Sequence, residues 1–347
     1  MLVTKPLLRV LAGSRENIPP IWLMRQAGRY LPEYRAIREK AGGFLDLCFD
    51  AKQAAEITLQ PVRRFGFDAA ILFSDILVVP HALGQRVTFE EGEGPRLDAL
   101  KDTSALKRLR QEIDQRRLEP VYEAIERVKV NLPAAVALLG FCGAPWTLAT
   151  YMIAGCGTVD QLPARRFAYQ FRDVFSKLID LLVEASAHYL IRQFAAGVDA
   201  VQIFDTWAGI LPAEEFSKWC IEPCARIVAA VRKEVPGAKI IGFPRGAATE
   251  LKRYLDAVAV DAVGLDWTVE LDFARDHIQP RRPIQGNLDP LALSVGGAAL
   301  DRSVDAILDA FSQGPFIFNL GHGVLPDTPV AHVERLVARV RGTPARG

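Results

Sequence analysis

The sequence PIWLMRQAGRYLPEY, residues 20–34, runs from a short apolar segment into a polar segment with arginines on both sides of a glycine. The apolar segment is long enough for a buried strand. Guanidinium groups stay charged and match carboxylates and phosphates in shape, so Arg25 and Arg29 after a strand indicate a site for an anionic ligand. A solvated basic loop is the alternative reading, but Trp22 and Gly28 are not typical of one.

Apolar segments of this kind recur along the chain, and helical patterns lie between most of them, for example over residues 163–196. Unbroken apolar runs suit strands that are buried on both faces of a parallel sheet. We expect eight strands, at residues 21–24, 69–73, 136–140, 200–204, 239–243, 262–265, 283–285 and 316–319. This alternation predicts an α/β protein, a (β/α)8 TIM barrel formed by a single domain over residues 1–347. A doubly wound open sheet is the alternative, but no Gly-x-Gly-x-x-Gly follows the first strand.

A small insertion interrupts the barrel pattern near residues 80–100. The segments 86–90 and 95–97, around the glycines at 92 and 94, are typical of a hairpin. We therefore expect one short antiparallel pair outside the parallel barrel.

Charge and cysteine content exclude several classes of protein. The chain has 42 basic and 41 acidic residues, a formal net charge of +1, so no overall field favours nucleic acid. Five scattered cysteines without a Cys-x-x-Cys pair predict a reduced, cytoplasmic protein without a metal site. Residues 130–159 carry no charge and could span a bilayer, but prolines and glycines interrupt them. We expect no membrane insertion.

A barrel of this type has its active site at the C-terminal ends of its strands. The polar residues there are Arg25, Arg29, Ser74, Asp75, Asp205, Thr206, Asp266, Gln285, Asn287, Asn319 and His322. No lysine ends a strand, which disfavours a Schiff-base aldolase. Nearby arginines should lower the pKa of Asp75 and keep it ionised, which suits an electrostatic role, although a helix cap is the simpler alternative. His322 lies between two glycines and can project into a cleft.

Seven motifs extend the pattern over nearly the whole chain. They are residues 20–34, FSDIL at 73–77, GAPWT at 143–147, FDTWAG at 204–209, GLDW at 264–267, QGNLDP at 285–290 and NLGHG at 319–323. In this order they resemble the uroporphyrinogen decarboxylase family. The resemblance implies a cytoplasmic homodimer that needs no cofactor. Its substrate would be uroporphyrinogen III, whose four acetate side chains lose CO2 to give coproporphyrinogen III in haem biosynthesis.

The resemblance also implies roles for single residues. The substrate-binding set would be Arg25, Gln26, Ala27, Gly28, Arg29, Arg38, Asp75, Tyr151, Thr206 and His322. Within it the catalytic residues would be Arg25, Arg29, Asp75, Tyr151 and His322, and Asp75 would accept the pyrrole N–H groups. No metal ligand is implied. The sequence departs from the family pattern at Thr206, where some members have serine, and at Arg245, where we expect a lysine.

Two other functions remain open from the sequence. A related barrel methyltransferase of the cobalamin or zinc type would use a His-x-Cys pair, which does not occur here. A non-catalytic porphyrin-binding protein would need the arginines but not Asp75.

Overall fold

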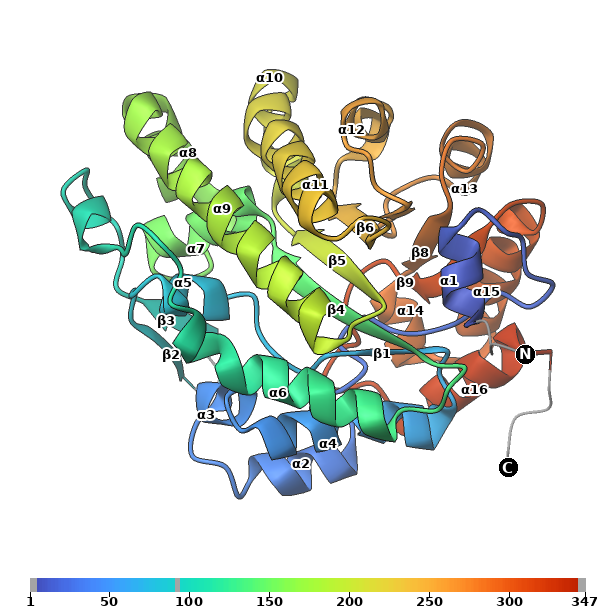
Figure 1. The fold of residues 1–347 in the computed structure, drawn as a ribbon. Coiled ribbons are helices and arrows are strands. Elements are labelled where there is room, and N and C mark those ends of the chain that lie inside the picture. The colour runs from blue at the N-terminus through green and yellow to red at the C-terminus, as the bar shows by residue number, and fades with distance from the viewer. Residues whose placement is uncertain (1–4, 91–93, 343–347) are drawn as a thin grey trace.

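The computed structural model describes residues 5–90 and 94–342. Its centre is a curled parallel sheet, surrounded by helices (Figure 1). In the described residues the strand order is β1-β4-β5-β6-β7-β8-β9. The bounds of these strands are Ala69–Ile71 (β1), Ala137–Gly143 (β4), Ala200–Asp205 (β5), Lys239–Pro244 (β6), Ala262–Gly264 (β7), Ile284–Leu288 (β8) and Phe316–Leu320 (β9).

The segment around Ile21 closes the sheet into the predicted (β/α)8 barrel. The Phe318 N–H of β9 donates to the Pro20 carbonyl at 2.9 Å, and the Asp68 N–H donates to the Ile21 carbonyl at 2.9 Å. Ile21 forms only a single bridge to Phe318, so the strand predicted over residues 21–24 is wrong in its length. The reason is that the Met24 N–H donates to the Asn319 side chain at 3.0 Å instead of extending a ladder.

Helices cover the outer face of the strands (Figure 1). The stretch predicted as one helix over residues 163–196 is two helices, because Phe171 leaves the helical conformation with φ −129° and ψ 53°. Short π-helical segments lie at Ser217–Ile221 and Ala274–Ile278. The α-helices are α1 Pro6–Leu11, α2 Pro32–Arg38, α3 Phe44–Cys48, α4 Ala51–Phe65, α5 Val78–Ala82, α6 Gln115–Asn131, α7 Pro145–Ala154, α8 Leu162–Gln170, α9 Arg172–Ala196, α10 Ala213–Phe216, α11 Glu222–Glu234, α12 Leu251–Ala257, α13 Leu271–Phe273, α14 Pro290–Val295, α15 Gly297–Phe311 and α16 Val330–Val340.

The predicted hairpin is present as β2 (Val87–Glu90) and β3 (Gly94–Leu97), which pair antiparallel. Gly92 lies outside the described residues. The Leu97 N–H donates to the Gly155 carbonyl at 2.8 Å, which attaches the hairpin to the end of α7. The hairpin is therefore held against the part of the barrel that follows β4.

The uncharged segment over residues 130–159 forms β4 and α7, both almost entirely buried. Apolar sequence is needed there because β4 is central in the sheet and α7 packs against α9. Among the described helices, none combines the length and apolar character needed to cross a bilayer.

An aspartate precedes each of three strands, β1, β5 and β7, and binds the neighbouring strand twice. Asp68, Asp199 and Asp261 each accept a hydrogen bond from a backbone N–H of that strand and donate their own N–H to the same residue's carbonyl. The partners, with the distances of the two bonds, are Ile21 (2.8 and 2.9 Å), Leu138 (2.7 and 2.8 Å) and Ile240 (2.9 and 2.8 Å). We call these three double contacts the aspartate staples. They fix neighbouring strands at their N-terminal ends.

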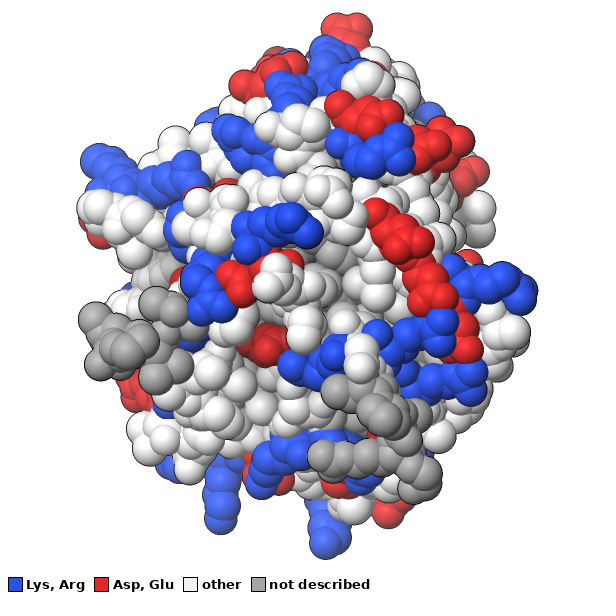
Figure 2. Space-filling view, turned by 90° about the vertical axis from the view of Figure 1, so that its right-hand side faces the viewer, with Lys and Arg blue, Asp and Glu red and all other residues white. Residues whose placement is uncertain are grey.

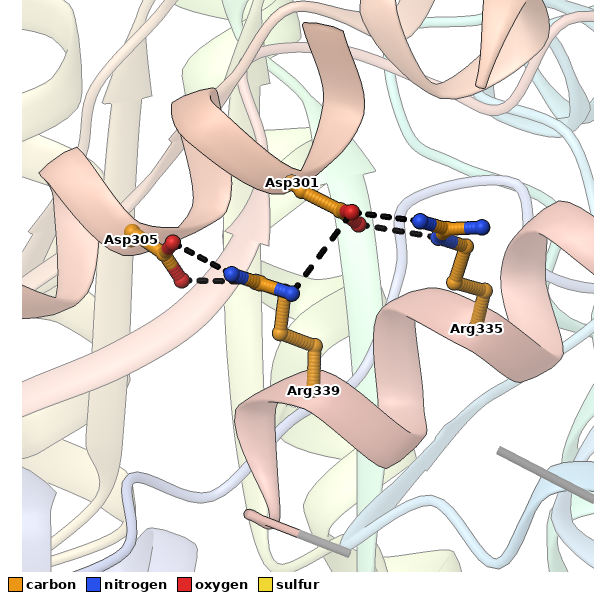
Figure 3. A network of polar contacts seen from close by, with 4 residues as sticks. All are labelled: Asp301, Asp305, Arg335 and Arg339. Atoms are coloured by element: carbon orange, nitrogen blue, oxygen red, sulfur yellow. Dashed lines mark hydrogen bonds and ion pairs between the residues drawn. The ribbon is translucent and has the colours of Figure 1, made fainter. Parts of the chain in front are cut away.

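Ion pairs join α16 to α15 on the surface. Arg335 binds Asp301, and Arg339 binds Asp305 and approaches Asp301 (Figure 3). Exposed pairs of this kind contribute little to stability. The docking of α16 depends more on its apolar face, which includes the fully buried Val333. On the face drawn in Figure 2, acidic and basic side chains are intermixed.

Candidate active site

A cavity of about 990 Å³ opens at the C-terminal ends of β1, β4, β5 and β9. Part of its wall comes from the hairpin, through Phe89 and Pro95, and part from helix α2 and the loop after it. Most of the residues predicted for the site line this one space. They are Arg25, Ala27, Gly28, Arg29, Arg38, Asp75, Tyr151, Thr206 and His322. The volume is at the upper end of the range for small-molecule sites, so the cavity suits a large ligand.

Arg25 is placed by an unusual backbone conformation. Its φ of 59° lies in the left-handed region, which is uncommon for a residue with a side chain. The neighbouring Met24 is fixed on both sides, because its N–H donates to Asn319 Oδ1 at 3.0 Å and its carbonyl accepts from the Val324 N–H at 2.9 Å. These contacts hold the turn and direct the Arg25 side chain along Gly323.

Gln26 is the one predicted binding residue that does not line the cavity. Its side chain is fully buried, where Oε1 accepts from the Leu23 N–H at 3.1 Å and Nε2 donates to the Ala69 carbonyl at 3.1 Å. These bonds join the arginine-containing loop to β1. Gln26 therefore shapes the loop from within the protein.

The arginines of the cavity have no anionic partner in the described part of the chain. Arg64, outside the cavity, shows the usual alternative, because its guanidinium forms two bonds to Glu33. In contrast, Arg25, Arg29 and Arg38 form no ion pair with a described residue and face the cavity. Their charges are available for carboxylates or phosphates of a ligand.

Asp75 lies in the same cavity, just after β1. Its Oδ1 accepts a hydrogen bond from the Leu77 N–H at 2.8 Å. Burial raises the pKa of Asp75 above its ordinary value, although the Leu77 hydrogen bond and the charge of Arg25 both oppose the rise. The prediction of a lowered pKa is therefore wrong. Removal of the carboxyl group from water outweighs the attraction of Arg25, which forms no direct ion pair with it.

Three further polar groups predicted for the site are neutral, whereas two exposed glutamates, Glu39 and Glu90, lie at the edge of the cavity. Burial and the charges of Arg25 and Arg245 lower the pKa of His322 to about 3. Burial raises the pKa of the Tyr151 hydroxyl, so this group stays protonated. Together with the half-buried Thr206 hydroxyl, they can donate or accept hydrogen bonds without adding charge.

Asp205 and Asp266 end strands but do not line the cavity. Asp205 accepts from the Thr147 hydroxyl at 2.6 Å, toward the helices. Asp266 accepts from the Gly246 N–H at 2.6 Å and from the Thr268 hydroxyl at 2.5 Å. Both carboxylates support loops of the barrel mouth through hydroxyl and backbone groups. Neither carboxylate forms an ion pair with an arginine among the described residues.

Several residues of the cavity were not singled out from the sequence. Its apolar walls include Phe44, Phe89, Phe141 and Phe204, and the rings of Phe141 and Phe204 pack edge to face at 5.7 Å. Phenylalanines occur throughout the core of this protein, so their type alone gave no signal. Only Phe204 could have been assigned to the cavity from the sequence, because it directly precedes Asp205 and Thr206 at a strand end.

The fold and the cavity define a class: a barrel enzyme with a cavity that suits a large, anionic, partly apolar ligand. The chain belongs to the uroporphyrinogen decarboxylase family, because the family model "Uroporphyrinogen decarboxylase (URO-D)" matches residues 3–343. Uroporphyrinogen decarboxylases of Brucella canis and Brucella suis are each 56% identical over 340 residues, which cover 98% of this chain and 99% of each relative.

Solved structures support the fold. A methyltransferase from Methanosarcina mazei superimposes with a TM-score of 0.78 and 18% identity, covering 99% of both chains. A B12-independent methionine synthase from Shewanella sp. W3-18-1 has a TM-score of 0.56 and 11% identity, covering 94% of this chain and 97% of that one. These likenesses concern the fold alone. Within the described residues, no three His, Cys, Asp or Glu side chains are grouped as metal ligands.

Proposed function

We propose that this protein converts uroporphyrinogen III to coproporphyrinogen III by removing CO2 from four acetate side chains. The observation that carries the proposal is that one cavity contains the carboxyl group of Asp75 and three arginines that form no ion pair with a described residue. Arginines suit the eight peripheral carboxylates of such a substrate. Asp75 suits the N–H groups at its centre. The phenylalanine walls suit the apolar faces of the pyrrole rings.

The chemistry requires an electron sink. A proton added to a carbon of the pyrrole ring gives a cation. The bond between the acetate methylene and its carboxylate then breaks, CO2 leaves, and the electron pair enters the ring as an exocyclic double bond. Protonation of that methylene and loss of the ring proton give the methyl group. Ring protonation supplies the sink, so we expect activity without a metal or an organic cofactor.

Asp75 is the group that we assign to the ring cation. A carboxylate that accepts the pyrrole N–H bonds stabilises positive charge as it develops on the ring. Its pKa is raised by burial, and Arg25 is the cation that limits the rise. Arg25 is also our candidate for the ring proton donor, although a guanidinium gives up a proton only in an unusual environment.

The remaining residues bind and orient. Arg29 and Arg38 are assigned to peripheral carboxylates on one wall of the cavity. Tyr151, Thr206 and His322 are assigned to hydrogen bonds that fix the ring system, with Tyr151 and His322 next to the reacting groups. Ala27 and Gly28 allow the substrate to approach the backbone closely. We assign Gln26 to supporting this loop from the core.

Incubation with uroporphyrinogen III under anaerobic conditions tests the proposal, with the products separated by their number of carboxyl groups. We expect species with seven, six, five and four carboxyl groups to appear in succession. Intact binding without release of CO2 would instead indicate a porphyrin-binding protein. Exhaustive chelation should leave the rate unchanged, and loss of activity that one metal restores would contradict the cofactor-free mechanism.

We also propose that the protein is a cytoplasmic homodimer. A two-fold dimer is the commonest soluble oligomer. Several exposed apolar side chains lie near one another in sequence around α8, namely Val159, Leu162, Tyr169 and Phe171. Such side chains are frequent in interfaces between subunits. Sedimentation that shows only monomer at micromolar concentration would contradict the dimer.

A further inference from the structure

Arg245 is a second cationic group at the barrel mouth, outside the wall formed by the predicted site residues. It follows the end of β6. Its N–H donates to the Asp205 carbonyl at 3.1 Å, and its own carbonyl accepts from the Gly209 N–H at 2.9 Å. Gly209 and Gly246 are in direct backbone contact, with no room for a side chain on Gly209. The backbone of Arg245 is thus fixed between β5 and the loop that follows it.

The side chain of Arg245 is also held in place. Its guanidinium lies over the ring of Trp267, at 4.9 Å from the ring centroid. The charge of Asp266 acts on Arg245, but that carboxylate accepts hydrogen bonds from Gly246 and Thr268 and forms no ion pair with Arg245 among the described contacts. Arg245 is therefore a half-buried cation that is supported by an aromatic face and forms no ion pair with a described residue.

Arg245 and Arg25 act on the same imidazole. Burial is the largest cause that lowers the pKa of His322, and the charges of both guanidinium groups lower it further. Burial also lowers the pKa of Arg245, where the charge of Asp266 opposes the shift and the charge of Arg25 adds to it. Like charges that face one neutral group repel one another. An anion placed between them would relieve this repulsion at little cost in side-chain entropy, because Arg245 is already held on Trp267.

We propose that Arg245, held on Trp267, binds a peripheral carboxylate of the substrate near His322, and that this is a carboxylate that the reaction retains. The proposal rests on the function proposed above. The reacting pyrrole ring has to lie beside Asp75 and the proposed proton donor Arg25, whereas Arg245 is not part of the cavity wall that these two residues share. A group at this place orients the ring system and contributes to selection of the substrate.

The first test compares Arg245→Met with Arg253→Met. Both changes remove one positive charge, but Arg253 is exposed on α12 and paired with Glu250. KM and kcat are measured with the octacarboxylate substrate and with the pentacarboxylate intermediate. We expect Arg245→Met to raise KM about tenfold for both, in line with loss of one charge-assisted contact. Because the retained carboxylates are the same in both compounds, KM should rise by the same factor for both. Arg253→Met should match the wild type.

Trp267→Leu is the second variant, because it keeps the charge of Arg245 and removes its support. KM should rise less than in Arg245→Met, and the double variant should resemble Arg245→Met alone, since both changes act on one contact. Melting temperatures equal to that of the wild type would show that the fold of each variant is intact. If a variant melts early, quenching of its fluorescence by uroporphyrin at low temperature replaces the kinetic comparison.

Two results would overturn the proposal. One is an unchanged KM in Arg245→Met. The other is an effect that decreases as acetates are removed, which would mean that Arg245 binds a reacting group. Failure of the proposed function would be seen separately, because the wild type would then release no CO2. Binding of uroporphyrin to the wild type, Arg245→Met and Arg253→Met would still show whether Arg245 holds a carboxylate.

Discussion

The Cδ atom of Arg25 occupies the position that a side chain on Gly323 would need. Gly323 follows His322 at the end of β9, and Arg25 follows the segment that closes the barrel between β9 and β1. An N-terminal and a C-terminal segment of the chain thus meet at the site, and the absence of a side chain on Gly323 leaves room for the Arg25 side chain.

Gly323→Ala should therefore displace Arg25 without removing its charge. We expect kcat/KM to fall roughly tenfold or more, because an active site loses rate when a charged group moves by about 1 Å. Steady-state kinetics measure the loss. In an Arg25→Met background the same change should have little further effect. Full additivity of the two changes would show that Gly323 acts independently of Arg25.

Asp75→Asn should abolish most of the activity and leave the fold intact. Asparagine keeps the size of the side chain but loses the charge that faces the protonated ring. By analogy with the loss of one preorganised electrostatic group, the barrier should rise by about 3 kcal/mol, or roughly a hundredfold in rate. Decarboxylation is assayed beside a thermal melt. Near wild-type turnover would refute the assigned role, and an early melt would show that Asp75 is structural.

Arg29→Ala should weaken binding more strongly for substrates that carry more carboxylates. Arg29 faces the cavity without an anionic partner among the described residues, so its charge is available for the peripheral groups of the ligand. KM for the octacarboxylate and pentacarboxylate compounds, measured side by side, tests this expectation. Equal effects on the two would indicate that Arg29 shapes the loop instead.

Asp205 should make the protein less stable as the pH rises. Burial raises the pKa of this carboxyl group to about 6, against roughly 3.9 in the unfolded chain. Between these values the unfolded state has released its proton while the folded state still holds it. The protonated group therefore stabilises the folded state fully below about pH 4, and about 3 kcal/mol of that stability is lost as the pH rises from roughly 4 to 6.

The measurement is denaturant unfolding of wild type and Asp205→Asn over that pH range. The variant lacks the titrating group, so its stability relative to the wild type should increase with pH by about 3 kcal/mol. Thr206→Ala is a suitable control beside it, because it changes the neighbouring residue but not the buried charge. A difference between Asp205→Asn and wild type that is independent of pH would contradict the raised pKa.

Much of the fold was predictable because a short run of apolar residues marks each strand in the sequence. Seven of the eight expected strands are present near their predicted positions, since runs such as that of β5 are buried on both faces and leave little choice of residue. The first strand could not be predicted correctly. Its length is decided by the Asn319 side chain, which is distant in sequence and takes the N–H of Met24.

Most of the residues that line the candidate site could be predicted from the sequence, but the pKa of Asp75 could not. Strand ends and the family resemblance brought together the residues that line the cavity. The pKa of Asp75 was predicted in the wrong direction, because sequence shows which charges are near but not how completely water is excluded. The prediction that Gln26 lines the cavity failed for a similar reason. A polar residue between two arginines gives no sign in the sequence that its amide points into the core.

The aspartate staples divide the barrel into parts that can be separated. Each staple lies within one pair of neighbouring strands, and none joins the segment that ends at Glu234 to the one that begins at Lys239. A chain that is cut in the loop between α11 and β6 therefore keeps every staple intact inside one fragment. We expect two separately synthesised pieces to reassemble by pairing β5 with β6 and the Ile21 segment with β9, with all of the cavity's arginines carried by the first piece.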